Sequence, residues 1–340
     1  MKHVFRISSH LTFYLSKKII EERKIKDDDC IFFLVRNYKV PIEHSSKFKH
    51  VIHTSYNVSS KIGRVFSFNF FKTKKNIKEF DKLVDAYIQG CSFIWYSQIC
   101  NDDFCSLMVT KTNCNGYYVI EDGIGSYLMS NPQTFTGVRY YIYKYFLLPF
   151  FPRIFEVKNW YINSIHKKFL GCIASSSECF PLHKEYLTVV KDIFEKVELD
   201  FVPDAILSVD PLFYYIEEDD LKKIFRDLSL YMKRKNYSVL AYKFHPYFNA
   251  NERKLLKNKY EELIRDLFLF ELIELSEHVV VENLLYTYQC DFYTNHSSIA
   301  VYASKMGAAC YSYSPIIKKY VSSYEELSIV QKFCTPIIIQ

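Results

Sequence analysis

The chain has 340 residues, of which 49% are hydrophobic and 24% charged, and its net charge is +6. These values are typical of a folded protein with two ordinary domains and exclude a disordered chain. The ten cysteines form no Cys-x-x-Cys pair and no His/Cys cluster with zinc spacing, which disfavours a zinc site and predicts a reducing, cytoplasmic environment.

Strand-like and helix-like segments alternate along the chain. In the first half, strands are predicted at 3–7, 30–35, 92–96 and 117–120, and helices at 11–22, capped by Ser8 or Ser9, and around 77–88. After an irregular stretch, strands are predicted at 169–174, 205–209, 239–244, 291–294 and 308–311, and helices at 221–232, 253–270 and 297–305. This alternation is typical of βαβ units and parallel sheets.

The predicted fold is therefore α/β, with two Rossmann-like domains that face each other across a cleft. We expect a first domain over residues 1–160 and a second over 161–320. Residues 321–340 are predicted to form a tail that packs back on the first domain. Many enzymes share this layout, so the layout alone does not define an activity.

Two acids and a glycine follow the predicted strand at 117–120: Glu121, Asp122 and Gly123. Open α/β sheets bind ligands at the carboxyl ends of their strands, so a carboxylate here is a candidate general base. One acid can point toward a ligand while the other holds the loop, and Gly123 allows a positive φ or a close approach of the backbone to substrate. A plain acidic turn is the alternative interpretation.

A histidine and a proline, His245 and Pro246, end the predicted strand at 239–244. Proline favours an extended conformation for the residue before it, which holds the imidazole at the strand end. Lys243 is predicted to project to the same side, two residues earlier. A pair of cations at a strand end suits a phosphate, and the histidine could protonate a leaving oxygen. The alternative is a histidine in the core, hydrogen-bonded to backbone.

Two further features lie near the C-terminus. Ser297 and Ser298 are expected at the N-terminus of a short helix, where hydroxyl and N–H groups could bind an anion or simply cap the helix. Glu282 follows three valines, and its carboxylate could bind ribose hydroxyls.

The stretch from 137 to 170 carries five net positive charges around an aromatic run at 140–151. The run is about half the length needed to span a bilayer, and it contains Lys144 and Pro149. It fits either the surface of an anionic membrane or a buried helix whose lysines reach to solvent. No motif for binding RNA or DNA is present, so nucleic acid is not expected as a partner.

With these motifs in this order, residues 1–315 resemble bacterial sialyltransferases of the GT-B fold. The resemblance is to the lipooligosaccharide and capsule sialyltransferases of glycosyltransferase family 52 and to related polysialyltransferases. It implies an inverting transfer of sialic acid from CMP-sialic acid to a galactose- or sialic-acid-terminated surface glycan. The acceptor is expected to be lipid-linked, the enzyme cytoplasmic and peripheral to the membrane, and no cofactor or metal is implied.

The same resemblance implies a role for each motif. Glu121 would be the base, with Asp122 as the alternative, and His245 would protonate the departing phosphate of CMP. Ser297 and Ser298 would hold that phosphate, and Glu282 would contact the ribose. The segment at 206–211 lies where such enzymes have a loop on the nucleotide side.

Two other functions stay open at this point. One is a different GT-B glycosyltransferase that uses another CMP-activated acidic sugar. The other is a non-catalytic protein at the membrane periphery that binds polyanions through the aromatic and basic stretch.

Overall fold

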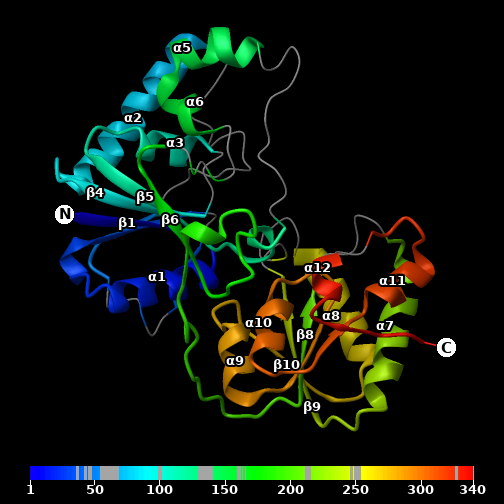
Figure 1. Cartoon of the computed structure of the whole chain (residues 1–340). Coiled ribbons are helices and arrows are strands. Elements are labelled where there is room, and N and C mark those ends of the chain that lie inside the picture. Colours follow the sequence, from blue (N-terminus) through cyan, green and yellow to red (C-terminus); the bar gives the residue numbers. More distant parts are fainter. Residues whose placement is uncertain are drawn as a thin grey trace. The chain divides into compact units, whose positions relative to one another are not determined.

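The computed structural model describes residues 1–35, 38–41, 44, 48–53, 69–98, 102–128, 141–158, 162, 164, 166–210, 216–245, 248, 254–325 and 328–339. The chain divides into two compact units, Met1–Ile193 and Phe194–Gln340. Each unit contains one parallel sheet with helices on both faces (Figure 1). The fold is α/β with two Rossmann-like domains, which confirms the predicted class.

The first unit is built on a seven-stranded sheet in the order β3-β2-β1-β4-β5-β6-β7, and all its strand pairs are parallel. Its strands are β1 (Lys2–Ile7), β2 (Cys30–Leu34), β3 (Val51–His53), β4 (Phe93–Ser97), β5 (Cys114–Ile120), β6 (Phe169–Ala174) and β7 (Leu187–Val189). Its helices are α1 (His10–Glu22), α2 (Phe70–Ile88), α3 (Asp103–Val109), α5 (Leu148–Phe150) and α6 (Pro152–Lys158), and a π-helix, η4, covers Tyr143–Leu147.

Consecutive residues of these strands pack on opposite faces of the sheet. Phe32 stacks on Phe5 with ring centroids 5.5 Å apart, whereas the next residue, Phe33, contacts Phe104 of α3 at 5.5 Å. Because side chains alternate along a strand, a sheet with both faces covered needs apolar residues at nearly every position. This is why β2 reads as an uninterrupted apolar run.

The turn from β1 to α1 settles which serine caps the helix. The hydroxyl of Ser9 accepts the backbone N–H of Thr12 at 3.3 Å, and the Thr12 hydroxyl accepts the N–H of Ser9 at 3.1 Å. This reciprocal pair is a capping box. The hydroxyl of Ser8 is therefore left for another partner, which proves to be a residue of the candidate site.

The second unit is built on a six-stranded parallel sheet in the order β10-β9-β8-β11-β12-β13. Its strands are β8 (Ala205–Val209), β9 (Val239–Phe244), β10 (Glu271–Glu274), β11 (Asp291–Thr294), β12 (Cys310–Ser312) and β13 (Thr335–Pro336). Its helices are α7 (Glu218–Lys233), α8 (Lys254–Leu267), α9 (Val281–Tyr288), α10 (Ile299–Lys305), α11 (Ser314–Tyr320) and α12 (Ser328–Gln331).

An apolar cluster of the second unit joins one sheet face to α7, α8 and α11. Leu207 and Tyr242 of the sheet lie in this cluster with Phe225 of α7, Tyr260 of α8 and Ile317 of α11. Helices α9 and α10 cover the other face (Figure 1). The strand order runs outward from β8 in both directions, so the direction of winding changes between β8 and β11.

The division of the chain differs from the expected boundary near residue 160. Strands β6 and β7 pair with the first sheet, because β6 lies beside β5 and β7 beside β6. The C-terminal residues belong to the second unit: Tyr324 and Ile337 lie in its core, and β13 pairs with β12.

Candidate functional site

The first unit places its two acids in different environments at the end of β5. Glu121 is fully buried and continues the ladder, donating its backbone N–H to Ile173 at 3.0 Å. Asp122 is half-buried. The backbone leaves the strand at Asp122, with φ of −128° and ψ of 44°, and enters a 3₁₀ segment where Gly123 has φ of 77°, a conformation that favours glycine. The two adjacent carboxylates therefore lie in different environments.

The carboxylate of Glu121 is a structural acceptor that joins β5 to β6. Its Oε2 accepts the backbone N–H and the hydroxyl of Ser175, both at 2.7 Å, and its Oε1 accepts the hydroxyl of Tyr127 at 3.0 Å. Burial, together with the Glu121 charge, raises the pKa of Tyr127, so this phenol stays protonated and donates. Both oxygens of Glu121 are committed to these three bonds.

We expect Glu121→Gln to lower the free energy of unfolding by about 1–3 kcal/mol, because the amide turns an N–H₂ group toward the buried donors of Ser175 or Tyr127. Chemical denaturation measures this. Asp122→Asn is the control, since Asp122 is half-buried, and its stability should stay within about 0.5 kcal/mol of wild type. Equal stabilities for Glu121→Gln and wild type would contradict the structural role.

Asp122 is held by residues that come from two directions. Its Oδ1 accepts the hydroxyl of Ser8 at 3.1 Å, and its backbone N–H is donated to the hydroxyl of Ser126 at 3.0 Å. Ser8 directly follows β1, and the winding of the first sheet changes direction between β1 and β4. Asp122 thus lies at the carboxyl edge, beside the switch point where Rossmann-like sheets bind ligands.

The second unit brings together the ends of three adjacent strands, β9, β8 and β11. The next residues are His245, Asp210 and the pair Asn295 and His296. The backbone N–H of His245 is donated to Val209 at 2.9 Å, and the backbone of His296 hydrogen-bonds the Asp210 carboxylate. These contacts form a continuous polar row across the switch point between β8 and β11.

Sequence reasoning placed the segment 206–211 on the nucleotide side but assigned no role to Asp210. It is 8% exposed, and within the described ranges its buried Oδ2 has no hydrogen-bond partner. Burial raises the pKa of Asp210 to about 7, although the hydrogen bond from the His296 backbone opposes that shift. A signal was present, because Asp210 follows an apolar strand just as Glu121 and His245 do.

Tyr324, which follows α11 in the chain, orders the residues at the end of β11. The hydroxyl of Tyr324 lies 2.7 Å from Nε2 of His296, and the two rings stack with centroids 5.2 Å apart. Tyr324 also accepts the side-chain amide of Asn295 at 3.4 Å. Burial lowers the pKa of His296, so this imidazole is neutral at pH 7. No local pattern in the sequence links Tyr324 to these residues.

The expected serine pair lies where the sequence predicted it, between β11 and α10. Ser298 is the N-cap residue of α10, without a side-chain capping bond, and both serines are half-buried. The hydroxyl of Ser297 accepts the backbone N–H of Ile299 at 3.2 Å, and its own N–H is donated to Thr294 at 3.0 Å. The structure therefore brings Ser297 and Ser298 to the same sheet edge as His245 and Asp210.

Lys243, in β9, and Glu282, in the first turn of α9, attract each other electrostatically. The Lys243 ammonium donates to the backbone carbonyls of Val279 and Glu277, which fixes the loop before α9. Burial lowers the pKa of Lys243 and raises the pKa of Glu282, and the attraction between their charges opposes both shifts. Lys243 is thus turned toward the backbone of this loop.

His245 is exposed, yet enough protein surrounds its ring that desolvation lowers its pKa. Pro246 lies outside the described residues. Within the described ranges, no group of three or more His, Cys, Asp or Glu could hold a metal ion.

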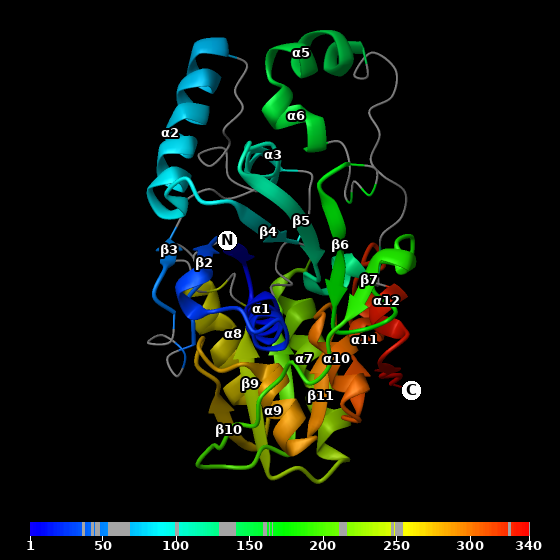
Figure 2. The ribbon, with the colours of Figure 1, turned by 60° about the vertical axis from the view of Figure 1, so that its left-hand side comes forward.

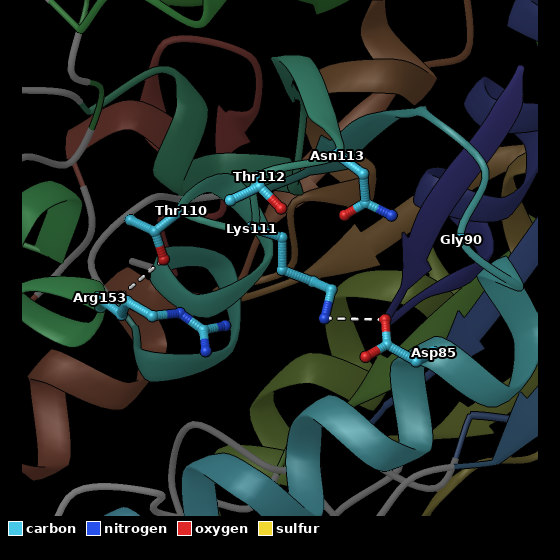
Figure 3. A pocket seen from close by; sticks show the side chains of 7 residues that line it. All are labelled: Asp85, Gly90, Thr110, Lys111, Thr112, Asn113 and Arg153. Carbon is cyan, nitrogen blue, oxygen red and sulfur yellow. Dashed lines mark hydrogen bonds and ion pairs between the residues drawn. The ribbon is translucent and has the colours of Figure 1, made fainter.

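A pocket of about 580 Å³ lies at the opposite edge of the first sheet (Figure 3), lined by Asp85, Gly90, Thr110, Lys111, Thr112, Asn113 and Arg153. Its charges are paired: Lys111 lies 2.9 Å from Asp85, and Arg153 donates to both oxygens of Asp81, at 2.6 and 2.8 Å. The segment 110–113 precedes β5, whereas Glu121 follows it. This pocket contains none of the predicted site residues.

The solved structures similar to this chain are of GT-B type. S. aureus MnaA in a co-structure with UDP is 13% identical, with a TM-score of 0.51 over 92% of this chain and 79% of that one. A putative UDP-N-acetylglucosamine 2-epimerase from Listeria monocytogenes is 10% identical, with a TM-score of 0.51 over 92% and 78%.

A third similar structure is the Methanocaldococcus jannaschii UDP-GlcNAc 2-epimerase in complex with UDP-GlcNAc and UDP. It is 11% identical, with a TM-score of 0.51 over 92% of this chain and 83% of that one. No protein-family model matches the chain, and no curated protein matches it in sequence. These comparisons establish a GT-B fold with two Rossmann-like domains.

They also correct one expectation, that of CMP-sialic acid as a partner. Two of the three structures contain UDP, and none of the three is described as a sialyltransferase. The three motifs that carried the resemblance are short. Strand-end acids, histidines and serines suit many nucleotide sites, so these motifs indicate the fold type without defining the nucleotide.

Proposed function

We propose that this protein is a glycosyltransferase that moves a sugar from a UDP-activated donor to a hydroxyl group of a glycan. The observation that carries the proposal is the polar row of His245, Asp210 and His296 on three adjacent strand ends. Rossmann-like sheets bind nucleotides at this switch point. UDP in two structures of the same fold supports UDP as the nucleotide.

In the proposed reaction, the second unit binds the donor through its phosphates. His245 donates a hydrogen bond or proton to the departing phosphate, with the hydroxyls of Ser297 and Ser298 as further donors. The lowered pKa of His245 describes the free chain, and the negative charge of a bound phosphate would raise it again. Glu282 is the proposed partner of the ribose hydroxyls, and Lys243 orders the loop before Glu282.

The first unit supplies the base, and we assign this role to Asp122. Glu121 is fully buried, and both its oxygens already accept hydrogen bonds, whereas Asp122 is half-buried. The turn at Gly123 supports this division of roles. A single displacement with inversion needs one base and a stabilised leaving group, and metal independence is part of the proposal.

A peripheral location at a membrane is also part of this proposal. An exposed group of aromatic and lysine side chains on the first unit supports it.

The test is UDP binding and UDP release by the purified protein in EDTA. We expect UDP to bind more tightly than CMP in titration calorimetry, and UDP-GlcNAc to release UDP faster when glycan acceptors are added. His245→Ala should lower that release by about 10²-fold or more, because it removes the proposed proton donor. The control is His50→Ala, on an exposed histidine of the first unit that directly precedes β3.

Mass spectrometry of the products separates the possible outcomes. A new glycosidic product supports transfer. Conversion of UDP-GlcNAc to an epimer, without transfer, would contradict the proposed transferase activity and assign epimerase activity instead. No binding of UDP by the folded protein would contradict the assignment of the nucleotide site.

A further inference from the structure

The first unit exposes large aromatic side chains from two segments that are far apart in the sequence. Phe71, in the first turn of α2, is 82% exposed. In the segment that leads through η4 to α5, Tyr141, Tyr145, Phe146 and Phe150 are each 58–63% exposed. Sequence analysis left two interpretations of this segment, a membrane-facing surface and a buried helix. The exposure of these side chains contradicts the buried helix.

These two segments form one surface. The Phe70 ring contacts Phe150 and Phe151 with centroids 6.1 and 5.3 Å apart, and Phe71 packs against Phe70 at 5.8 Å. Figure 2 shows α2 and the α5–α6 segment at the same end of the first unit. We define the aromatic surface by its six exposed rings, Phe70, Phe71, Tyr141, Tyr145, Phe146 and Phe150.

The charges around the aromatic surface are mostly positive. Residues 70–78 include four exposed lysines, one of which, Lys75, lies 3.8 Å from Glu79 in the next turn of α2, and residues 141–151 include Lys144 and no acid. Two of these five lysines lie over aromatic rings: Lys74 is 4.3 Å from the centroid of Phe70, and Lys144 is 5.5 Å from that of Tyr145. Arg153, which sequence reasoning counted with this basic patch, is instead paired with Asp81.

This combination fits an anionic bilayer better than another copy of the chain. Exposed aromatic rings suit the boundary between headgroups and acyl chains, and lysines beside them suit anionic headgroups. A symmetric pair of chains would bring ten lysines together, and Glu79 pairs with only one of the five, Lys75, in each copy. Among the described residues no helix is long and apolar enough to cross a membrane.

We propose that the aromatic surface binds the face of an anionic lipid bilayer, with its rings in the headgroup region and the lysines beside them on lipid phosphates and carboxylates. This inference rests on the peripheral location in the proposed function. Its test measures lipid binding alone, so a failure to transfer sugar would leave it intact.

Flotation with vesicles of phosphatidylcholine, with or without phosphatidylserine, tests the proposal. The wild-type protein should float with phosphatidylserine vesicles, remain unbound with phosphatidylcholine alone, and dissociate as salt is raised. Lys72→Ser with Lys74→Ser should weaken the partition constant about 30-fold. Phe71→Ser should weaken it at least tenfold, because the exposed ring loses its contact with lipid.

Matched controls come from the second unit. Leu255→Ser replaces a side chain that is 85% exposed on α8, and Lys233→Ser with Lys254→Ser removes the same charge elsewhere. These controls should float like wild type, and melting curves should show all variants folded. Failure of the wild type to float with anionic vesicles, or equal losses in test and control variants, would overturn the proposal.

Discussion

Replacing Asp122 with asparagine is expected to lower the rate of sugar transfer by about 10²–10⁴-fold, which is the usual contribution of a general base. Asparagine keeps the size of the side chain and an oxygen that can accept the Ser8 hydroxyl, now 3.1 Å from Oδ1. What it removes is the ability to take a proton from the acceptor. The measurement is the rate at saturating donor and acceptor, with UDP affinity measured separately.

The same experiment separates the two adjacent acids. UDP affinity and melting temperature of Asp122→Asn should stay near wild type, because Asp122 is half-buried and outside the nucleotide row. Ser8→Ala should cause a smaller loss of rate, since Ser8 only orients the carboxylate. If Asp122→Asn retained nearly full activity and a folded Glu121→Gln did not, the base would be Glu121, as the sequence resemblance implied.

Replacing Asp210 with asparagine is expected to stabilise the protein above pH 7 and to change little near pH 4.5. The pKa of Asp210 is about 7 in the folded chain and about 3.9 when unfolded. The folded state therefore holds this proton between these pH values while the unfolded state releases it, so wild-type stability falls as pH rises through this window. Above pH 7 the full cost of burying the charge applies, at most about 4 kcal/mol.

Thermal melting of both proteins across this pH range measures the effect. Burial also raises the pKa of Glu282, but this acid is present in both proteins and cancels in the difference. The control is Asp192→Asn, which makes the same substitution at an exposed position. A pH-independent difference for Asp210→Asn would show that the carboxyl is ionised throughout or that the loop rearranges.

Much of the fold could be predicted from strand and helix patterns. Four strands coincide with the predicted ranges: β6, β8, β9 and β11. Helix α3 was missed because all seven of its residues are buried, so it has no polar face and no helical period. The short strands β3, β7 and β13 were missed because two or three residues cannot show a period.

The candidate site could be predicted only in part, for a different physical reason. The rule that ligands bind at strand ends located Glu121 and His245, and it would have located Asp210 had it been applied at every strand. Which acid turns inward depends on Ser175 and Tyr127, which reach Glu121 from other segments. The direction of Lys243 depends on the loop before α9. Such contacts arise from tertiary packing and leave no local pattern.

The lengths of the edge strands have a consequence for how this chain behaves at high concentration. Among the described residues, the outermost strands are β3 and β7 in one sheet and β10 and β13 in the other, and they have two to four residues each. A short edge offers few unpaired N–H and C=O groups to which a foreign strand could add. The chain has 29 tyrosines and 29 phenylalanines, residues that favour strands, so short edges limit its tendency to aggregate by strand addition.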